Sequence, residues 1–175
     1  MSVLSRDQIR DALNASPPLL ESFLKSEDQL QSNGFDLTIA HVASFTDGGH
    51  IGIDNAHRLL PATKLLQFDG DGFIQLETGS YLVTFNEVVH LPKNLMALAK
   101  PRSSLLRSGV AVHNAVWDAG YHGRSQALLV VYNRFGFRLA QNARIVQMIF
   151  LTLDHPTSQA YSGRFQGENL FYDQT

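Results

Sequence analysis

The chain contains no cysteine among its 175 residues. It therefore has no disulfide framework, no thiolate nucleophile, no cysteine-ligated zinc and no iron–sulfur cluster. Long hydrophobic runs are lacking too, because no segment approaches the ~20 apolar residues of a membrane span. The first residues also lack the basic-then-apolar profile of a signal peptide. We therefore expect a cytoplasmic protein without a membrane partner.

An excess of charge of one sign is also lacking, since the formal net charge is −2. Nucleic-acid binding usually leaves a basic footprint, so we expect no nucleic-acid partner. A small anionic ligand stays possible, because a few clustered arginines suffice to bind it. The 44% hydrophobic content excludes disorder, and the length predicts a single domain over residues 1–175.

Several common catalytic motifs are missing. The sequence has no P-loop, no Gly-x-Gly-x-x-Gly opening a helix and no Gly-x-Ser-x-Gly nucleophile elbow. Its seven histidines are scattered, with no two at the i, i+2 or i, i+4 spacing that places imidazoles on one face. We therefore expect surface or structural histidines and no metal ligands.

Three segments differ in character. Residues 1–32 form an N-terminal helical segment, residues 33–155 a β core, and residues 156–175 a C-terminal arm. From residue 33 onward Gly, Pro and Asn punctuate short apolar runs, which indicates strands. The arm is polar with isolated aromatics, and either frays or orders on something else.

A helix is expected near the N-terminus. Ser5 and Gln8 have the spacing of a capping box, and Leu4 with Ile9 can form a hydrophobic staple. Pro17 and its neighbour are expected to stop the helix.

Beyond it we expect a second short helix over residues 19–24 and one helical turn over residues 103–107. Strands are expected at residues 35–42, 73–76, 80–89, 95–99, 109–112, 126–132 and 145–153. Many strands at short spacing without long helices predict an all-β sandwich, jelly roll or barrel.

Four blocks stand out within this pattern. They are residues 33–37 (NGFDL), 101–109 (PRSSLLRSG), 117–123 (WDAGYHG) and 143–147 (ARIVQ). With these blocks in this order, the chain resembles the family that joins deoxyuridine triphosphatases with zinc-independent deoxycytidine triphosphate deaminases. The resemblance runs from about residue 4 to residue 167. The resemblance implies a β-clip, or distorted jelly roll, with a short N-terminal helix. It also implies a homotrimer whose active sites lie between subunits; which subunit supplies which group stays open.

Phosphate binding is expected at the second block. Arg102, Ser103 and Ser104 offer a guanidinium, two hydroxyls and the free N–H groups of a starting helical turn. The alternative is a serine cap beside a solvated arginine. Gln147 lies in an apolar strand and needs a partner, which a phosphate oxygen or a backbone carbonyl supplies. The resemblance assigns phosphate binding to Arg102, Ser103, Ser104, Arg107, Gln147 and Arg164.

Asp118 is the candidate catalytic residue. Hydrolysis of a phosphoanhydride needs a carboxylate that orients a water and accepts its proton. Asp118 ends a predicted strand before a turn, where a side chain can face a pocket. The alternative is a turn aspartate that caps its own backbone. The resemblance implies that it holds the water or the sugar 3′-hydroxyl.

The resemblance also implies a set of nucleoside contacts. Tyr121 would reject ribonucleotides with its ring, or else be a core aromatic. The other expected contacts are Asn114 in the preceding hairpin, and Phe165 and Gln166 in an arm that is more like the deaminase type. Asp36 would support the phosphate-binding arginine, or simply end a turn.

The two chemistries of the family differ in one group. The deaminases carry a glutamate on the strand after the turn, but residues 124–133 contain no acid. This strand is about two residues longer than in common members of either branch, and the stretch before Asp118 is correspondingly shorter than in typical deaminases. The combination resembles the triphosphatase branch of archaea and some bacteria. We predict a deoxyuridine triphosphate diphosphatase that yields dUMP and pyrophosphate. Mg²⁺ would be held mainly by substrate phosphates and water. A zinc-independent dCTP deaminase and a non-catalytic deoxynucleotide-binding protein remain alternatives, and the preference for uracil over cytosine stays open.

Overall fold

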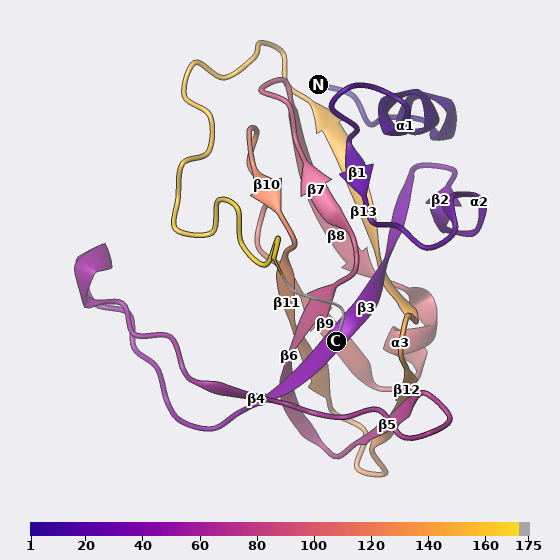
Figure 1. Ribbon diagram of the computed structural model, residues 1–175, viewed down its shortest axis with the longest axis vertical. Helices are drawn as coiled ribbons and strands as arrows, with labels where there is room; N and C mark the ends of the chain where they lie inside the picture. Colours follow the sequence, from indigo (N-terminus) through magenta and orange to yellow (C-terminus); the bar gives the residue numbers. More distant parts are fainter. Residues whose placement is uncertain (172–175) are drawn as a thin grey trace.

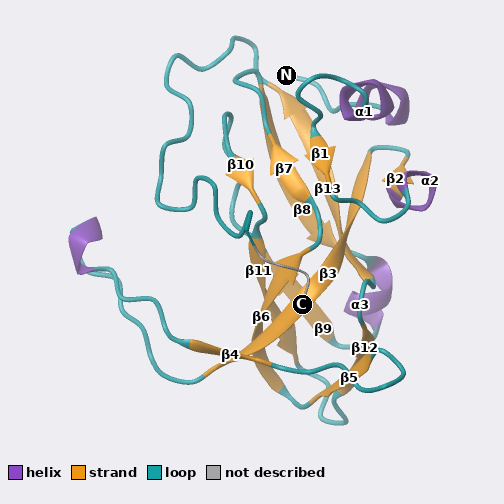
Figure 2. Cartoon of the chain, viewed as in Figure 1, coloured by secondary structure: helices purple, strands orange, loops and turns teal. Residues whose placement is uncertain are grey.

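Antiparallel strands dominate the computed structural model (Figures 1 and 2), which describes residues 1–171. The strands are β1 (Leu20–Glu21), β2 (Leu30–Gln31), β3 (Gly34–Phe45), β4 (Thr63–Leu65), β5 (Phe73–Leu76), β6 (Gly79–Phe85), β7 (Val88–His90), β8 (Leu95–Pro101), β9 (Val110–His113), β10 (His122–Gly123), β11 (Gln126–Val131), β12 (Phe137–Ala140) and β13 (Arg144–Thr152). The helices are α1 (Arg6–Leu13), α2 (Ser26–Gln29), the 3-10 turn η1 (Asn55–His57) and α3 (Ser103–Arg107). The expected mainly β class is confirmed.

The main sheet runs in the order β8-β13-β3-β6-β11-β9, and β2 and β4 add to β3. Its two end strands, β8 and β9, contact each other and are joined through α3. The sheet therefore curls into a near-barrel around one core. Two small sheets, β1-β7-β10 and β12-β5, complete the architecture.

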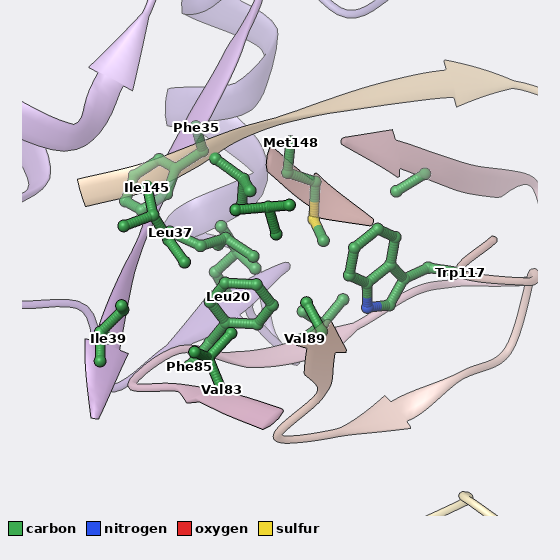
Figure 3. Close-up of a cluster of buried hydrophobic side chains, with 14 of the residues drawn as sticks. Leu20, Phe35, Leu37, Ile39, Val83, Phe85, Val89, Trp117, Ile145 and Met148 are labelled. Atoms are coloured by element: carbon green, nitrogen blue, oxygen red, sulfur yellow. The ribbon is translucent and has the colours of Figure 1, made fainter. Parts of the chain in front are cut away.

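The core fills the inside of this curl (Figure 3). Phe35, Phe85 and Met148 have no exposed surface, and Trp117 closes the cluster at 5% exposure. The first seven residues of β3 are all buried, because α1, α2 and β2 contact the strand in addition to its sheet neighbours. Polar residues of β3 are therefore buried along with the apolar ones.

The N-terminal helix forms as its sequence predicts. The Ser5 hydroxyl accepts from the Gln8 backbone N–H while the Gln8 side chain accepts from the Ser5 N–H, a capping box. Leu4 and Ile9 are both buried. The helix ends at Leu13, a few residues before the prolines.

Two expected elements are wrong. Residues 19–24 form no helix, because Leu20 is fully buried in β1 and Ser22 adopts a left-handed backbone at φ 58°. The expected strand at 80–89 is split into β6 and β7. The split falls at Glu87, whose fully buried carboxylate accepts hydrogen bonds from Thr38 and Gln29.

A long hairpin joins β3 to β4 and projects from the body (Figure 1). We call residues 46–62 the projecting hairpin. Its side chains Ile51 and Ile53 are 81% and 110% exposed.

No helix within residues 1–171 is long and apolar enough to cross a membrane.

Candidate functional site

A cavity of about 700 Å³ lies beside the third block. It lies between the base of the projecting hairpin, β11, the turn after Trp117 and the C-terminal segment, and we call it the aromatic pocket. Its lining includes Phe45, Trp117, Asp118, Tyr121, Ser125, Gln126, Tyr161, Phe165 and Glu168. Flat aromatic rings with a few polar groups are typical of a site for a planar ligand.

Asp118 is placed at the rim of this pocket by its neighbour. The backbone of Trp117 exchanges hydrogen bonds of 2.9 and 3.1 Å with Ala97 of β8, which anchors the turn to the sheet. The Asp118 side chain is exposed and lines the pocket. Its carbonyl accepts from the Tyr121 N–H at 3.0 Å, which closes the turn. The expected turn therefore forms, and its carboxylate stays available to a ligand.

Tyr121 lies deeper in the same pocket and is 5% exposed. Its hydroxyl donates to Glu168 Oε1 at 2.8 Å, and its ring meets Tyr161 edge to face. Burial, followed by the Glu168 carboxylate, raises the pKa of Tyr121 well above its ordinary value. The ring is thus a neutral, fixed wall of the pocket.

The other expected nucleoside contacts are placed differently. Phe165 lines the aromatic pocket, whereas Gln166 and Asn114 are absent from its lining. Gln166 donates to the Gly120 carbonyl at 3.0 Å and accepts from the His122 N–H at 3.1 Å. Asn114 is half-buried, and its Oδ1 has no hydrogen-bond partner among the described residues.

Two of the expected phosphate residues, Arg102 and Ser104, line a second cavity of about 340 Å³. We call it the cationic pocket, because Arg102, Arg138 and Arg144 line it together with Ser104 and Ser108. Guanidinium groups and serine hydroxyls of this kind suit phosphate oxygens.

Other expected phosphate residues lie near this pocket or apart from it. Ser103 and Arg107 lie on α3, where an Arg107 N–H donates to the Ser103 carbonyl at 3.2 Å. Gln147 is directly opposite Asp36 in the pairing of β13 with β3. Arg164 is exposed on the C-terminal segment, away from this group in the chain.

Asp36 pairs with two of the arginines that line the cationic pocket. Its Oδ2 lies 3.4 Å from Arg102 Nε and 3.6 Å from Arg144, and its side chain is 2% exposed. Burial raises the pKa of Asp36 more than the two guanidinium groups lower it. The contact to Arg102 is the one that the resemblance implies.

The two pockets share no lining residue. Asp118 and Tyr121 line one, and Arg102 and Ser104 line the other. A single chain therefore does not bring the expected catalytic carboxylate and the expected phosphate residues into one cavity.

Several residues of these pockets were not predicted from the sequence, among them Arg144, Ser125 and Glu168. Arg144 stands inside the fourth block, but its role could be read only from its distance to Asp36. Ser125 lines the aromatic pocket with a buried Oγ that has no partner within the described part of the chain. Glu168 lies in the predicted C-terminal arm, shortly after the aromatic residues Tyr161 and Phe165. This position was the only signal for it in the sequence.

Three comparisons with known proteins show which proteins this chain is similar to. The family model described as dCTP deaminase-like matches residues 3–153. A Methanosarcina mazei protein named probable deoxyuridine 5′-triphosphate nucleotidohydrolase is 48% identical over 169 residues, which are 97% of this chain and 99% of that protein. An Archaeoglobus fulgidus protein of the same name is 42% identical over 170 residues, 97% of this chain and 99% of that protein.

One solved structure is also similar. It is the 2′-deoxycytidine 5′-triphosphate deaminase from Agrobacterium tumefaciens, with a TM-score of 0.67 and 25% identity. The match covers 87% of this chain and 49% of that one, so this chain spans about half the length of that protein.

Proposed function

The chain belongs to the dCTP deaminase-like family, and from its archaeal relatives, which match almost its whole length, we propose that it is a deoxyuridine triphosphate diphosphatase. It hydrolyses dUTP to dUMP and pyrophosphate, the activity in the name of its archaeal relatives. We propose further that residues 1–175 act as one domain, which the single hydrophobic core supports.

One observation favours hydrolysis over deamination. Gln126 of β11 lines the aromatic pocket, and Leu128 and Val130 follow it on the same face of the strand; all three are half-buried and none is acidic. The glutamate that the deaminases place on this strand is therefore missing, and Gln126 donates to Thr84 Oγ1 instead. Asp118, the water-orienting carboxylate that hydrolysis needs, lines the same pocket.

The nucleoside enters the aromatic pocket in this proposal. Phe165 stacks on the base, and the ring of Tyr121 stands where a ribose 2′-hydroxyl would be. Asn114, in the hairpin that precedes Trp117, offers the base its buried Oδ1, which has no hydrogen-bond partner among the described residues. Gln166 acts indirectly, because its amide holds the backbone around Tyr121.

The reaction follows from the position of Asp118. Its carboxylate orients a water toward the α-phosphorus and takes one proton from it. The new P–O bond forms as the bond from the α-phosphorus to the bridging oxygen breaks, and pyrophosphate leaves. Arg102, Ser103 and Ser104 stabilise the charge that moves onto the leaving phosphates.

A second subunit completes this site. The aromatic and cationic pockets are separate in one chain, so we propose a homotrimer in which the two pockets of neighbouring subunits face each other. The projecting hairpin supports this, because exposed isoleucines such as Ile51 and Ile53 are costly in water and suit a subunit contact. Arg107, Gln147 and Arg164 then extend the phosphate contacts.

Magnesium fits this arrangement as a companion of the substrate. Within residues 1–171 no group of three or more His, Cys, Asp or Glu side chains is arranged to hold a metal ion. We propose that Mg²⁺ is bound mainly by phosphate oxygens and water, with Asp118 as the nearby carboxylate. Its contribution is to neutralise phosphate charge.

The test compares two substrates side by side. Pyrophosphate released from dUTP supports the proposal, and ammonia released from dCTP supports the zinc-independent deaminase instead. Tight binding of either nucleotide without turnover would indicate a non-catalytic deoxynucleotide-binding protein.

A further inference from the structure

The C-terminal segment, residues 160–169, lies along the turn and strand that carry Tyr121 (Figure 1). The Gly167 N–H donates to the His122 carbonyl at 2.7 Å, and the Arg124 N–H donates to the Glu168 carbonyl at 2.9 Å. These backbone bonds hold the segment, whose residues 164–169 form turns, beside β10. They deliver the side chain of Glu168 to the aromatic pocket.

Glu168 meets Tyr121 there through one direct contact. The tyrosine hydroxyl donates to Glu168 Oε1 at 2.8 Å, across 47 positions of sequence. A Cβ atom at Gly123 would lie 2.8 Å from that hydroxyl and 3.2 Å from the Glu168 backbone nitrogen. The absence of a side chain at Gly123 is therefore what allows the hydroxyl and the segment to meet.

The ring of Tyr121 is consequently held at both ends. The carboxylate holds its hydroxyl, and Tyr161 packs edge to face against the ring at 5.7 Å between centroids. A hydrogen bond to a charged acceptor is stronger than one between neutral groups. A ring tied in this way cannot move aside for a bulkier ligand.

We propose that Glu168 is a positioning residue that fixes Tyr121 against the sugar and thereby sets the preference for deoxyribose over ribose. The inference rests on the proposed function, since it assumes that the sugar lies beside Tyr121. A rigid ring excludes the extra 2′-hydroxyl by contact, whereas a ring released from Glu168 can shift and admit it.

Selectivity between dUTP and UTP tests this role. In Glu168→Ala, we expect the ratio of kcat/KM for dUTP to that for UTP to fall about tenfold, the factor typical of one lost hydrogen bond to a charged group. Glu168→Gln keeps an acceptor oxygen for the hydroxyl and should retain most of the preference. Tyr121→Phe should lose about as much preference as Glu168→Ala.

The double variant shows whether Glu168 acts through Tyr121. If it does, adding Glu168→Ala to Tyr121→Phe changes the preference no further, because the contact is already gone. Additive losses would overturn the proposal.

Asn169 supplies a matched control in the same segment. It lines the aromatic pocket too, but its side chain donates to the Arg124 carbonyl at 2.9 Å, and no hydrogen bond or ring contact joins it to Tyr121 among the described residues. Glycine suits its backbone, which has a φ of 53°. Asn169→Gly removes this side-chain hydrogen bond and keeps the backbone bonds of Gly167 and Glu168 that hold the segment in place, so the sugar preference should stay unchanged. A loss equal to that of Glu168→Ala would show that docking alone matters, and would overturn the specific role of Glu168.

Activity toward dUTP separates this inference from the proposed function. If the wild type does not hydrolyse dUTP, the proposed function fails whatever the variants show. If the wild type hydrolyses dUTP but Glu168→Ala keeps full sugar preference, the inference alone fails.

Discussion

Asp36 of β3 and Arg102 at the start of α3 form an ion pair of 3.4 Å in which the carboxylate is 2% exposed and the guanidinium 36%. The buried partner is fixed by its strand, and the exposed partner points to the cationic pocket. The buried Asp36 carboxylate therefore orients the Arg102 guanidinium, the proposed phosphate-binding group, toward the cationic pocket.

Asp36→Asn should impair binding more than folding. Burial of the carboxylate is costly and offsets the ion pairs, and the arginines left unpaired, Arg102 and Arg144, are 36% and 34% exposed to water, so we expect the free energy of unfolding to change by less than about 1 kcal/mol. Arg102 loses its anchor, and KM for the triphosphate should rise about tenfold. Urea unfolding and steady-state kinetics measure the two effects.

Glu27→Gln is the matched control, because Glu27 pairs with Arg6 at 2.9 Å while 72% exposed. Such a surface pair contributes little, so neither stability nor KM should change. A large loss of stability in Asp36→Asn with an unchanged KM would show that the pair is structural.

Asp118→Asn should abolish turnover and preserve binding. The amide cannot accept the proton of the attacking water, and general-base groups typically contribute 10²–10⁴-fold, so we expect kcat to fall about a thousandfold. The side chain is exposed and forms no part of the core, so thermal unfolding and nucleotide affinity should match the wild type. A near-normal rate would remove Asp118 from the mechanism.

Local signals explain what the sequence could predict. The Ser5 capping box and the turn of α3 depend on residues three or four positions apart, and both form. β1 and β10 have two residues each and exist only through pairing with β7. No local pattern shows that pairing, and Leu20 in an apolar stretch could equally fit a helix.

The site follows the same division. The four blocks led us to expect chemistry at particular side chains, which stays a prediction, but they did not show that Asp118 and Arg102 would line different pockets of one chain. Glu87 interrupts the predicted strand at 80–89 because its side chain accepts a hydrogen bond from Thr38. Thr38 lies 49 positions away, so no local pattern in the sequence shows this contact. Glu168 joins Tyr121 over a similar separation. Contacts of this range come from packing and leave no periodic trace.

Glu87 should make the protein less stable as the pH rises. Its carboxyl is fully buried, and burial raises its pKa above the ordinary 4.5 despite hydrogen bonds from Thr38 and Gln29. Between the unfolded and folded pKa values the folded state holds more protons, so its contribution is complete below about 4.5 and is lost as the pH rises through the folded value.

Urea unfolding between pH 5 and 8 compares the wild type with Glu87→Gln, which has no proton to lose. The difference in stability between the two proteins should shift with pH in favour of the variant. Asp36 and Glu168 also have raised pKa values, but they are present in both proteins and cancel. Parallel curves for the two proteins would mean that Glu87 ionises at the same pH whether folded or unfolded.

Two inactive variants should restore each other if the site is shared between subunits. Asp118→Asn keeps an intact cationic pocket, and Arg102→Gln keeps an intact aromatic pocket. Equal amounts of the two variants are unfolded, mixed and refolded together. At each interface the chance of an intact aromatic pocket is one half, and the chance of an intact cationic pocket from the neighbouring subunit is also one half. About a quarter of the wild-type rate should return, because a cyclic trimer pairs each subunit with a different neighbour. Each variant refolded alone stays inactive and serves as the control. If mixed trimers form, as differently tagged copies purify together, and no activity returns, each chain must supply both groups itself, and the shared site is wrong.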